Sequence, residues 1–289
     1  MTLNILNSMK KIAIQGIKGS FHEDAAIRYF DSEEIEVIEC KSFRSVCNLI
    51  DSDQVDIAVM AIENSIAGSI LQNYSLIRDY HLRVIGEIYI HIHMNLMMIP
   101  GGRKDDITTI YSHPIAIRQC AEYLEDCFPN VKIVENQDTA ASGKIISSEK
   151  LSDAAAIGNV RTAGIYGLDI IDSGIETNKK NFTRFWILSK HGNSNSMNNK
   201  ASLAFEVGHY YGALAKALNI FAANKINLNK IQSIPIVGKP NEYTIHVDLE
   251  YDSEDAYEKA IHEVLKNVSS LSILGEYVRG KLTTTQYDI

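Results

Sequence analysis

The sequence has no apolar run close to the roughly 20 residues that a membrane-spanning helix needs. Residues 1–11 also have neither the apolar core nor the small-residue cleavage site of a signal peptide. Positive charge is in short supply, because the net charge is −8 and the isoelectric point is about 5.6. These features predict a cytoplasmic protein and argue against nucleic acid or a membrane as the main partner. A small anionic substrate is not excluded, since a pocket can be basic inside an acidic protein.

Cysteine is scarce as well, with four residues in two pairs that are each spaced seven apart. The pairs are Cys40 with Cys47 and Cys120 with Cys127. No Cys-x-x-Cys pair, Cys/His zinc pattern or G-x-G-x-x-G fingerprint occurs. His91 and His93 lie two apart without a nearby third ligand, so we interpret them as structural. We therefore expect reduced core cysteines and no metal or redox cofactor.

The rest of the composition is that of a soluble globular protein, with 45% hydrophobic and 22% charged residues. A chain of 289 residues predicts two or three folding units. Up to Ser189, strand-like and helix-like segments alternate, which predicts an α/β protein with helices on both faces of its sheets. Residues 56–60 are almost wholly apolar and predict a central parallel strand. This region is too long for one comfortable sheet, so we expect two lobes with a cleft between them.

The C-terminal part is organised differently. Residues 191–200 are polar and lack periodicity, which predicts a linker. Residues 201–281 then show the order strand, helix, strand, strand, helix, strand. That order is typical of the ferredoxin-like βαββαβ plait.

One strand carries a reactive pair of side chains. Residues 181–188 read Asn-Phe-Thr-Arg-Phe-Trp-Ile-Leu and predict a buried strand. Thr183 and Arg184 stand at the head of this strand. A bare guanidinium is costly to bury, so Arg184 must reach solvent, a carboxylate or an anionic ligand.

A glycine turn follows the first strand. Residues 16–22 read Gly-Ile-Lys-Gly-Ser-Phe-His between a strand at 11–16 and a helix. Such a turn can point free backbone N–H groups and the Ser20 hydroxyl at an anion. In the structural alternative, Ser20 only caps the helix.

Two further strand ends offer polar groups. Residues 61–69 bring an acceptor, an amide and a hydroxyl together beside Gly68, and Ser65 can instead cap a helix. Ser112 and His113 open another helix, where His113 can act as an acid or base or be a structural, hydrogen-bonded histidine.

Four motifs together resemble one family. They are G-x-x-G-S-F at 16–21, I-E-N-S-x-x-G at 62–68, S-H-P with Q-C at 112–114 and 119–120, and N-x-T-R-F at 181–185. Each motif is modest alone, but the ordered set is specific. Over nearly its whole length the chain resembles the prephenate dehydratase family. Its C-terminal part looks like the ACT regulatory domain that follows the catalytic domain in that family.

The resemblance implies a cytosolic, cofactor-free lyase of phenylalanine biosynthesis that converts prephenate to phenylpyruvate, water and carbon dioxide. It implies a catalytic domain of the two-lobed periplasmic-binding-protein type and a C-terminal ferredoxin-like ACT domain. The implied bounds are 10–190 for the catalytic domain (lobe 1 at 10–87 and 180–190, lobe 2 at 88–179), 191–200 for the linker and 201–281 for the ACT domain. Homodimers or homotetramers and inhibition by phenylalanine are usual in the family.

The resemblance also implies roles for individual residues. Thr183 is expected to be the catalytic general acid, with Arg184 as a donor to a carboxylate and Phe185 as part of a dry wall. The expected substrate-binding residues are Ser20, Phe21, Glu63, Asn64, Ser65, Gly68, Ser112 and His113. The expected phenylalanine site is formed by Gly212, Ala213, Leu214, Gln232, Ser233, Ile234 and Pro235.

The sequence departs from the family pattern at a few positions. Ile17 stands where Pro is frequent, and His22 stands where Ser or Thr is frequent, which would alter the local hydrogen bonding. Residues 232–235 read Gln-Ser-Ile-Pro instead of Glu-Ser-Arg-Pro, and Tyr211 replaces a frequent Pro, which bears on phenylalanine binding. No chorismate mutase helices precede Lys11, so we expect a monofunctional chain.

Two alternatives remain beside this hypothesis. A two-lobed sensor could bind an aromatic or keto acid without turning it over. Within the lyases, arogenate, the amino analogue of prephenate, is the competing substrate.

Overall fold

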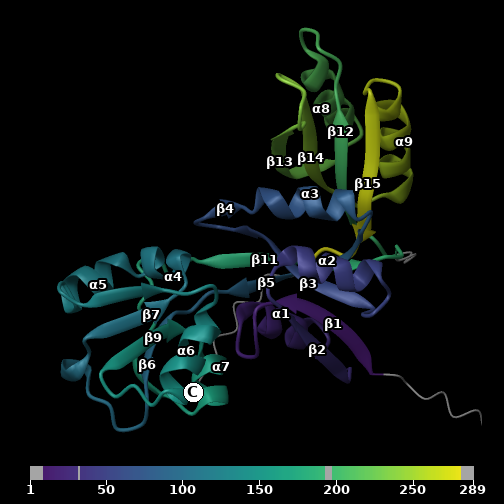
Figure 1. The fold of residues 1–289 in the computed structure, drawn as a ribbon. Coiled ribbons are helices and arrows are strands. Elements are labelled where there is room, and N and C mark those ends of the chain that lie inside the picture. Colours follow the sequence, from purple (N-terminus) through teal and green to yellow (C-terminus); the bar gives the residue numbers. More distant parts are fainter. Residues whose placement is uncertain (1–8, 32, 193–196, 281–289) are drawn as a thin grey trace, which may run out of the picture. The chain divides into compact units, whose positions relative to one another are not determined.

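The computed structural model describes residues 9–31, 33–192 and 197–280 (Figure 1). These residues form two compact units. One unit holds the described residues up to Leu76 together with Ile88–Phe185, and the other holds Ile77–Glu87 and the described residues from Trp186 onward. Residues 193–196 of the predicted linker and residue 281 of the predicted C-terminal domain lie outside the described residues. Within the described ranges, no helix is long and apolar enough to cross a membrane.

The first sheet combines the N-terminal part of the chain with the strand predicted at 181–188. Its elements are β1 (Lys10–Gln15), β2 (Ile35–Cys40), β3 (Ile57–Asn64), β4 (Gly68–Ser69), β5 (Arg83–His91), β11 (Phe182–Ser189), α1 (Phe21–Tyr29), α2 (Phe43–Asp51) and α3 (Leu71–Asp79). The strand order is β2-β1-β3-β11-β5, and β1 runs parallel to β2 and β3. Every residue of β3 except Glu63 is buried, so the predicted central parallel strand is confirmed.

Local signals explain the first two helices. Ser20 caps α1 by accepting a hydrogen bond from the backbone N–H of Glu23. Ser42 caps α2 in the same way through Ser45. The apolar stripe of α2 is buried at Val46, Cys47 and Ile50, which packs the helix against β1 and β3.

The second sheet belongs to the other lobe of the first unit. Its elements are β6 (Asn95–Met98), β7 (Thr109–Ser112), β8 (Lys132–Glu135), β9 (Ala154–Gly158), β10 (Asp169–Ser173), α4 (Pro114–Gln119), α5 (Ala121–Cys127), α6 (Thr139–Ser148), α7 (Val160–Tyr166) and the 3-10 helix η1 (Lys104–Asp106). The strand order is β10-β6-β9-β7-β8, with β7 parallel to β8 and β9 and with β6 antiparallel to β9 and β10. The fully buried β9 lies at the centre and packs against α6.

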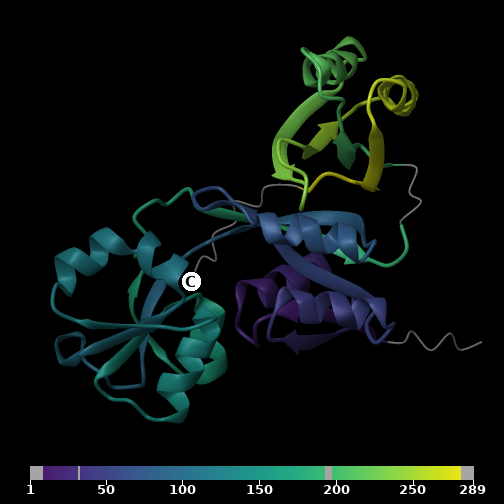
Figure 2. The ribbon, with the colours of Figure 1, turned by 45° about the horizontal axis from the view of Figure 1, so that its top comes forward.

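The third sheet forms the C-terminal plait (Figure 2). Its elements are β12 (Lys200–Glu206), α8 (Ala213–Ala223), β13 (Asn227–Pro235), β14 (Tyr243–Glu250), α9 (Glu254–Leu265) and β15 (Ser270–Tyr277). The strand order is β13-β14-β12-β15, antiparallel throughout. Phe205, Phe221 and Val247 are buried in the core that the sheet shares with the helices. The predicted fold class of two α/β lobes and a βαββαβ plait is confirmed, whereas the exact domain bounds stay predictions.

The structure corrects several local expectations. Helix α3 was not predicted. The helix that begins at Pro114 is interrupted at Cys120, which ends α4 and precedes α5. The four cysteines are free, but Cys127 is exposed, so the prediction that all four lie in the core is wrong for this residue.

Candidate active site

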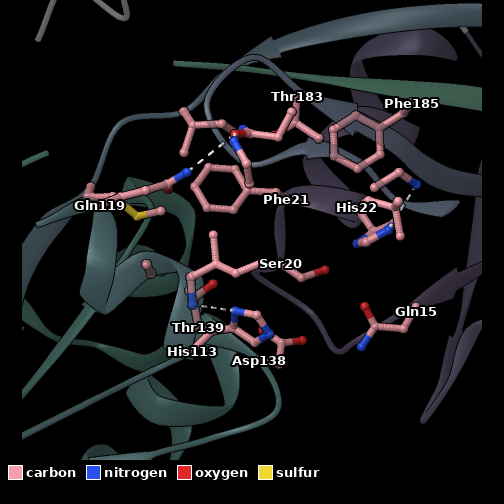
Figure 3. Close-up of a pocket in the computed structure, with 18 of the residues that line it drawn as sticks. Gln15, Ser20, Phe21, His22, His113, Gln119, Asp138, Thr139, Thr183 and Phe185 are labelled. Atoms are coloured by element: carbon pink, nitrogen blue, oxygen red, sulfur yellow. Dashed lines mark hydrogen bonds between the residues drawn. The ribbon is translucent and has the colours of Figure 1, made fainter. Parts of the chain in front are cut away.

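The first unit contains a cavity of about 380 Å³ that both lobes line (Figure 3). Its volume lies in the range of roughly 300–1,000 Å³ that is typical of small-molecule sites. No lysine or arginine is among the described residues that line it. The polar and aromatic lining includes Ser20, Phe21, His22 and Thr183 from the first lobe and His113, Gln119 and Asp138 from the second.

Strand β11 directs alternate side chains to opposite sides. Thr183 and Phe185 line the cavity, and Arg184 between them points away from it. Arg184 is buried, its Nη1 lies 3.9 Å from Oε2 of Glu63, and its guanidinium lies 5.9 Å from the centre of the Tyr89 ring. In the described structure neither Arg184 nor Glu63 lines the cavity, and the expected contacts of this pair with the substrate stay predictions. Arg184 points away because the period of two along a strand places neighbours on opposite faces.

Asn64 holds the hydroxyl of Thr183. Its Oδ1 accepts hydrogen bonds from the backbone N–H groups of Ile66 and Ala67 at 3.0 and 2.8 Å. The amide group Nδ2 therefore points the other way, 3.0 Å from Oγ1 of Thr183 and 2.7 Å from Oδ1 of Asn181. Because Thr183 Oγ1 accepts this hydrogen bond, its own proton can be donated into the cavity.

Gln119 is a site residue that the sequence analysis did not name. Its Nε2 lies 3.3 Å from Oδ1 of Asn64, so the second lobe contacts the group that orients Thr183. Gln119 stands in one of the four motifs, which was the available signal. Gln15, Asp138 and Thr139 also line the cavity, and Asp138 caps α6.

The predicted substrate-binding residues divide into two groups. Those that line the cavity are Ser20, Phe21, Asn64, Gly68 and His113. Ser65 and Ser112 do not line it in the described structure, because their hydroxyls serve the backbone. Ser65 Oγ accepts from Phe182 N–H at 2.9 Å, and the buried Ser112 Oγ donates to the Ile157 carbonyl at 2.8 Å. The expected substrate contacts of these two serines stay predictions.

His113 has the structural role of a helix cap and also lines the cavity, while the acid or base role stays a prediction. Its Nδ1 accepts a hydrogen bond from the Ile115 N–H at 3.2 Å and so caps α4. Burial, followed by the nearby Arg118 charge, lowers the pKa of His113, although Glu135 opposes this shift. The neutral ring therefore offers its remaining nitrogen, Nε2, as a donor at the cavity.

The glycine turn binds carboxylates of the protein itself. The N–H of Ile17 donates to Asp138 Oδ2 at 3.1 Å, and the N–H of Gly19 donates to Glu23 Oε2 at 2.7 Å. The N–H of Lys18 donates to Glu39 Oε1 at 2.8 Å. These three N–H groups are therefore not free for a substrate anion, which favours the structural alternative in which Ser20 caps the helix. Gly16 is required here, because it has a φ of +104° and a Cβ would lie 2.3 Å from Asp138 Oδ2.

His22 has a half-buried, oriented ring in the same cavity. Its Nε2 accepts a hydrogen bond from the Ala61 N–H at 3.2 Å. The ring lies edge-on to Phe185, with the ring centres 5.0 Å apart, and it is tilted against Phe43 at 5.6 Å. Burial lowers the pKa of His22 to about 3, so the imidazole is neutral at physiological pH.

A second, more charged cavity of about 630 Å³ lies in the same unit. His91 and His93 line it, and His91 Nε2 lies 2.6 Å from the Lys179 carbonyl while His93 Nδ1 lies 3.4 Å from Glu176 Oε1. These contacts support the interpretation of both histidines as structural. Among the described residues, no group of three or more His, Cys, Asp or Glu side chains is placed to hold a metal ion.

The predicted effector residues lie on two elements of the plait. Gly212 adopts a φ of +80° immediately before α8, where Ala213 is buried and Leu214 is partly buried. Residues 232–235 form the end of β13, which is an edge strand of the third sheet. Ile234 is buried there, and Gln232 Nε2 donates to the Ser233 carbonyl.

Comparison with known proteins identifies the family. A family model described as prephenate dehydratase matches residues 12–193, which include both lobes and the whole cavity lining. The chain belongs to the prephenate dehydratase family. It is accordingly a dehydratase, a lyase of aromatic amino acid biosynthesis, and Thr183 and Asn64 lie within the matched region.

Individual relatives within the prephenate dehydratase family are similar over most of the chain. An arogenate dehydratase/prephenate dehydratase of Arabidopsis thaliana is 33% identical over 94% of this chain and 72% of its own. A bifunctional chorismate mutase/prephenate dehydratase of Aquifex aeolicus is 31% identical over 94% of this chain and 74% of its own. A solved structure of prephenate dehydratase in complex with L-Phe from Arthrobacter aurescens is 25% identical, with a TM-score of 0.83 over 93% of this chain and 90% of that one.

Proposed function

We propose that this protein converts prephenate to phenylpyruvate, water and carbon dioxide. The observation that carries the proposal is the Thr183 hydroxyl, which lies in a cavity between two lobes and is oriented by Asn64 Nδ2 at 3.0 Å. The family supports the reaction class, and the cavity has a suitable size.

The reaction requires a proton donor at the ring hydroxyl that leaves. Prephenate loses its ring hydroxyl and its ring carboxylate, and the electrons of the broken C–C bond make the ring aromatic. Hydroxide is a poor leaving group, so a donor must protonate it as it departs, and water and carbon dioxide are the two small products. Thr183 is the proposed donor, because its oxygen already accepts from Asn64 and its own proton remains available.

Neutral groups are proposed to bind the dianionic substrate. No lysine or arginine lines the cavity among the described residues, so backbone and side-chain donors near helix starts take over this role. Ser20 stands at the start of α1 and Thr139 at the start of α6. Asp138 also lines the cavity, and burial raises the pKa of this carboxyl, although the hydrogen bonds that it accepts from the Ala140 and Ile17 N–H groups oppose the shift.

Aromatic side chains are proposed to favour loss of carbon dioxide. Phe21 and Phe185 line the cavity and replace water around part of the substrate. A carboxylate that is poorly solvated loses its charge more easily, so decarboxylation is assisted. Aromatisation makes the step strongly downhill, and the protein has mainly to position the substrate.

A direct assay tests the proposal. Purified protein is mixed with prephenate, and phenylpyruvate is followed by its absorbance. Turnover that falls by a factor of about 10² or more in Thr183→Ala while prephenate still binds supports the proposal. Binding without turnover by the unaltered protein would instead favour the sensor hypothesis.

Arogenate is the second candidate substrate, since the Arabidopsis relative is named for both arogenate and prephenate. The two substrates differ only at the side-chain amino or keto group. The ratio of their kcat/KM values, measured on the same preparation, decides between them. A ratio above one for prephenate supports the main proposal, and a ratio below one replaces it with arogenate dehydration.

Phenylalanine is the proposed effector of an ACT-type C-terminal domain. The Arthrobacter structure that resembles this chain was solved with L-Phe, and the Gly-Ala-Leu element of the predicted site begins α8 here. Millimolar phenylalanine is expected to lower the rate, and Gln232→Ala is expected to weaken that response. Equal rates with and without phenylalanine would show that the Gln-Ser-Ile-Pro sequence no longer supports the effector. A homodimer or homotetramer and a cytosolic location stay predictions, for light scattering and cell fractionation to test.

A further inference from the structure

His22 lines the cavity and lies outside the four motifs. It occupies the second position of α1. Its imidazole ring contacts the rings of Phe185 and Phe43, and these two contacts fix the plane of the imidazole. A ring held on two sides and by a backbone hydrogen bond has one orientation, so the direction of each nitrogen is defined.

Hydrogen bonding determines the tautomer of His22. The Ala61 N–H can only donate, so Nε2 must carry a lone pair. The ring is neutral, because burial lowers its pKa to about 3. The single ring proton of the neutral imidazole therefore resides on Nδ1.

Nδ1 faces the cavity. No hydrogen bond joins this nitrogen to another of the described residues, and it is not among the atoms that are fully enclosed. Figure 3 shows the ring with one nitrogen bonded on its far side and the other directed toward the space between Ser20 and Gln15. A donor without a protein partner at the surface of a substrate cavity is available to the substrate.

We propose that Nδ1–H of His22 donates a hydrogen bond to the keto-acid side chain of the bound substrate; this inference rests on the function proposed above. His22 contacts Phe185, and Phe185 is two residues, or about 6.6 Å, along β11 from Thr183. If Thr183 serves the leaving hydroxyl, His22 lies toward the opposite end of the substrate ring. That end bears the departing carboxylate and the keto-acid chain. If Nδ1–H donated to the departing ring carboxylate, it would stabilise the negative charge that decarboxylation must remove. The keto-acid chain is therefore the inferred acceptor.

The hydrogen bond is the same before and during the reaction, because the keto-acid chain does not react. It therefore contributes to binding of the substrate and of the transition state alike. Loss of the donor should raise KM and leave kcat nearly unchanged. Because His22 is neutral across the working range, its loss should not alter the shape of the pH profile.

Two amide substitutions separate the two nitrogens. The side-chain oxygen of His22→Gln can replace Nε2 as the acceptor for Ala61, whereas the side-chain nitrogen of His22→Asn can replace Nδ1 as the donor. His22→Gln should raise KM about tenfold with kcat within about twofold, since one hydrogen bond contributes roughly 1–1.5 kcal/mol. His22→Asn should keep KM within about threefold of the unaltered protein. The exposed His262→Asn is the matched control and should change neither constant.

Binding of phenylpyruvate provides a readout independent of turnover. This product keeps the keto-acid chain and lacks the ring carboxylate and the ring hydroxyl of prephenate. His22→Gln should therefore weaken the binding of phenylpyruvate about tenfold as well. Thermal unfolding and far-UV circular dichroism identify a variant that fails to fold. If one of the two His22 variants fails to fold, the other is compared with the unaltered protein.

The outcomes distinguish this inference from the proposed function. Turnover of neither prephenate nor arogenate by the unaltered protein would defeat the proposed function, and the phenylpyruvate comparison would still test His22. Equal effects of the two substitutions on KM and on phenylpyruvate binding, or a larger effect of His22→Asn, would overturn the inference by assigning His22 a structural role. A fall in kcat at constant KM would place the nitrogen at the leaving hydroxyl and would also overturn it.

Discussion

Asn64 and Thr183 are joined by a hydrogen bond in which Asn64 Nδ2 lies 3.0 Å from Thr183 Oγ1. The side-chain amide cannot reverse, because its oxygen already accepts from Ile66 and Ala67. The hydroxyl that the reaction requires as a donor is therefore oriented by a residue 119 positions earlier in the chain. This relationship makes Asn64 a positioning residue and leads to the first prediction.

Asn64→Asp should lower kcat, and it should also raise KM because the new carboxylate repels an anionic substrate. The new carboxylate keeps the acceptor for Ile66 and Ala67, but it offers no donor to Thr183 and competes for the threonine proton. We expect kcat to fall by a factor of about 10²–10³, within the range for a displaced proton donor. Steady-state kinetics with both constants reported is the measurement. A rise in KM at unchanged kcat would mean that Asn64 binds the substrate and does not position Thr183.

Activity should tolerate a substitution of Thr183 only if the new residue has a side-chain hydroxyl. Thr183→Ser keeps the donor and should retain at least about a tenth of kcat, whereas Thr183→Ala should lose a factor of about 10²–10⁴. Thr108→Ala removes a threonine hydroxyl on the surface of the other lobe, where its partner is Asp153, and serves as the control. The proton-donor role is abandoned if the serine and alanine variants have the same rate.

A buried ion pair should govern the stability of the second unit. Lys200 Nζ lies 2.9 Å from Glu87 Oε1, with 2% and 0% of the two side chains exposed. Lys200→Met leaves the Glu87 charge buried with less compensation, so the free energy of unfolding should fall by about 3–5 kcal/mol. Denaturant unfolding followed by circular dichroism is the measurement.

Two further variants control this experiment. Replacing both partners, as in Lys200→Met with Glu87→Leu, should restore part of the lost stability because no charge stays buried. Lys239→Met removes the lysine of an exposed pair with Glu242 and should cost about 0–1 kcal/mol. If the single and double variants were equally unstable, the loss would come from packing and not from the uncompensated carboxylate.

Acid should destabilise the second unit through His246. Burial, with a smaller contribution from the Arg78 charge, lowers the pKa of His246 to about 4, although Asp248 opposes this shift and Lys230 adds to it. The unfolded chain binds this proton near pH 6.5 and the folded chain only near pH 4, so stability is lost as the pH falls through that window.

His246→Gln removes the imidazole whose proton binding differs between the folded and the unfolded chain. Between pH 6.5 and pH 5 the unaltered protein should lose about 2 kcal/mol more stability than the variant, at roughly 1.4 kcal/mol per pH unit. Unfolding curves at the two pH values provide the comparison. An identical loss in both proteins would show that His246 is not protonated on unfolding in this range.

Patterns in the sequence anticipated much of the fold and the reacting strand, because those signals are local. The apolar period placed β3, β9, α2 and both helices of the plait, and the N-x-T-R-F motif located the threonine of the cavity. The sequence pattern could not show which of two neighbouring residues in one strand faces the cavity. Thr183 and Arg184 looked equally suited to a substrate, and only the pairing of β11 in its sheet shows which one faces the cavity.

The role of the glycine turn stayed open for a related reason. Its residues correctly indicated backbone N–H groups that bind an anion, but the sequence could not say which anion. Glu23 lies four residues after Gly19, whereas Asp138 lies 121 residues after Ile17 and comes from the other lobe. A contact over such a separation has no local signature, and it satisfies a donor that was open to a ligand.

The sequence by itself determined the alternation of strands and helices, the C-terminal plait and the family to which the chain belongs, since these depend on periodicity and on short ordered motifs. Only the tertiary structure decided which polar groups remain available to a substrate. Availability depends on what is left after every donor and acceptor has met its partners, and most of those partners lie on other strands or in the other lobe. Thr183 and His22 keep a proton for the cavity, while Arg184, Ser65 and Ser112 engage the protein.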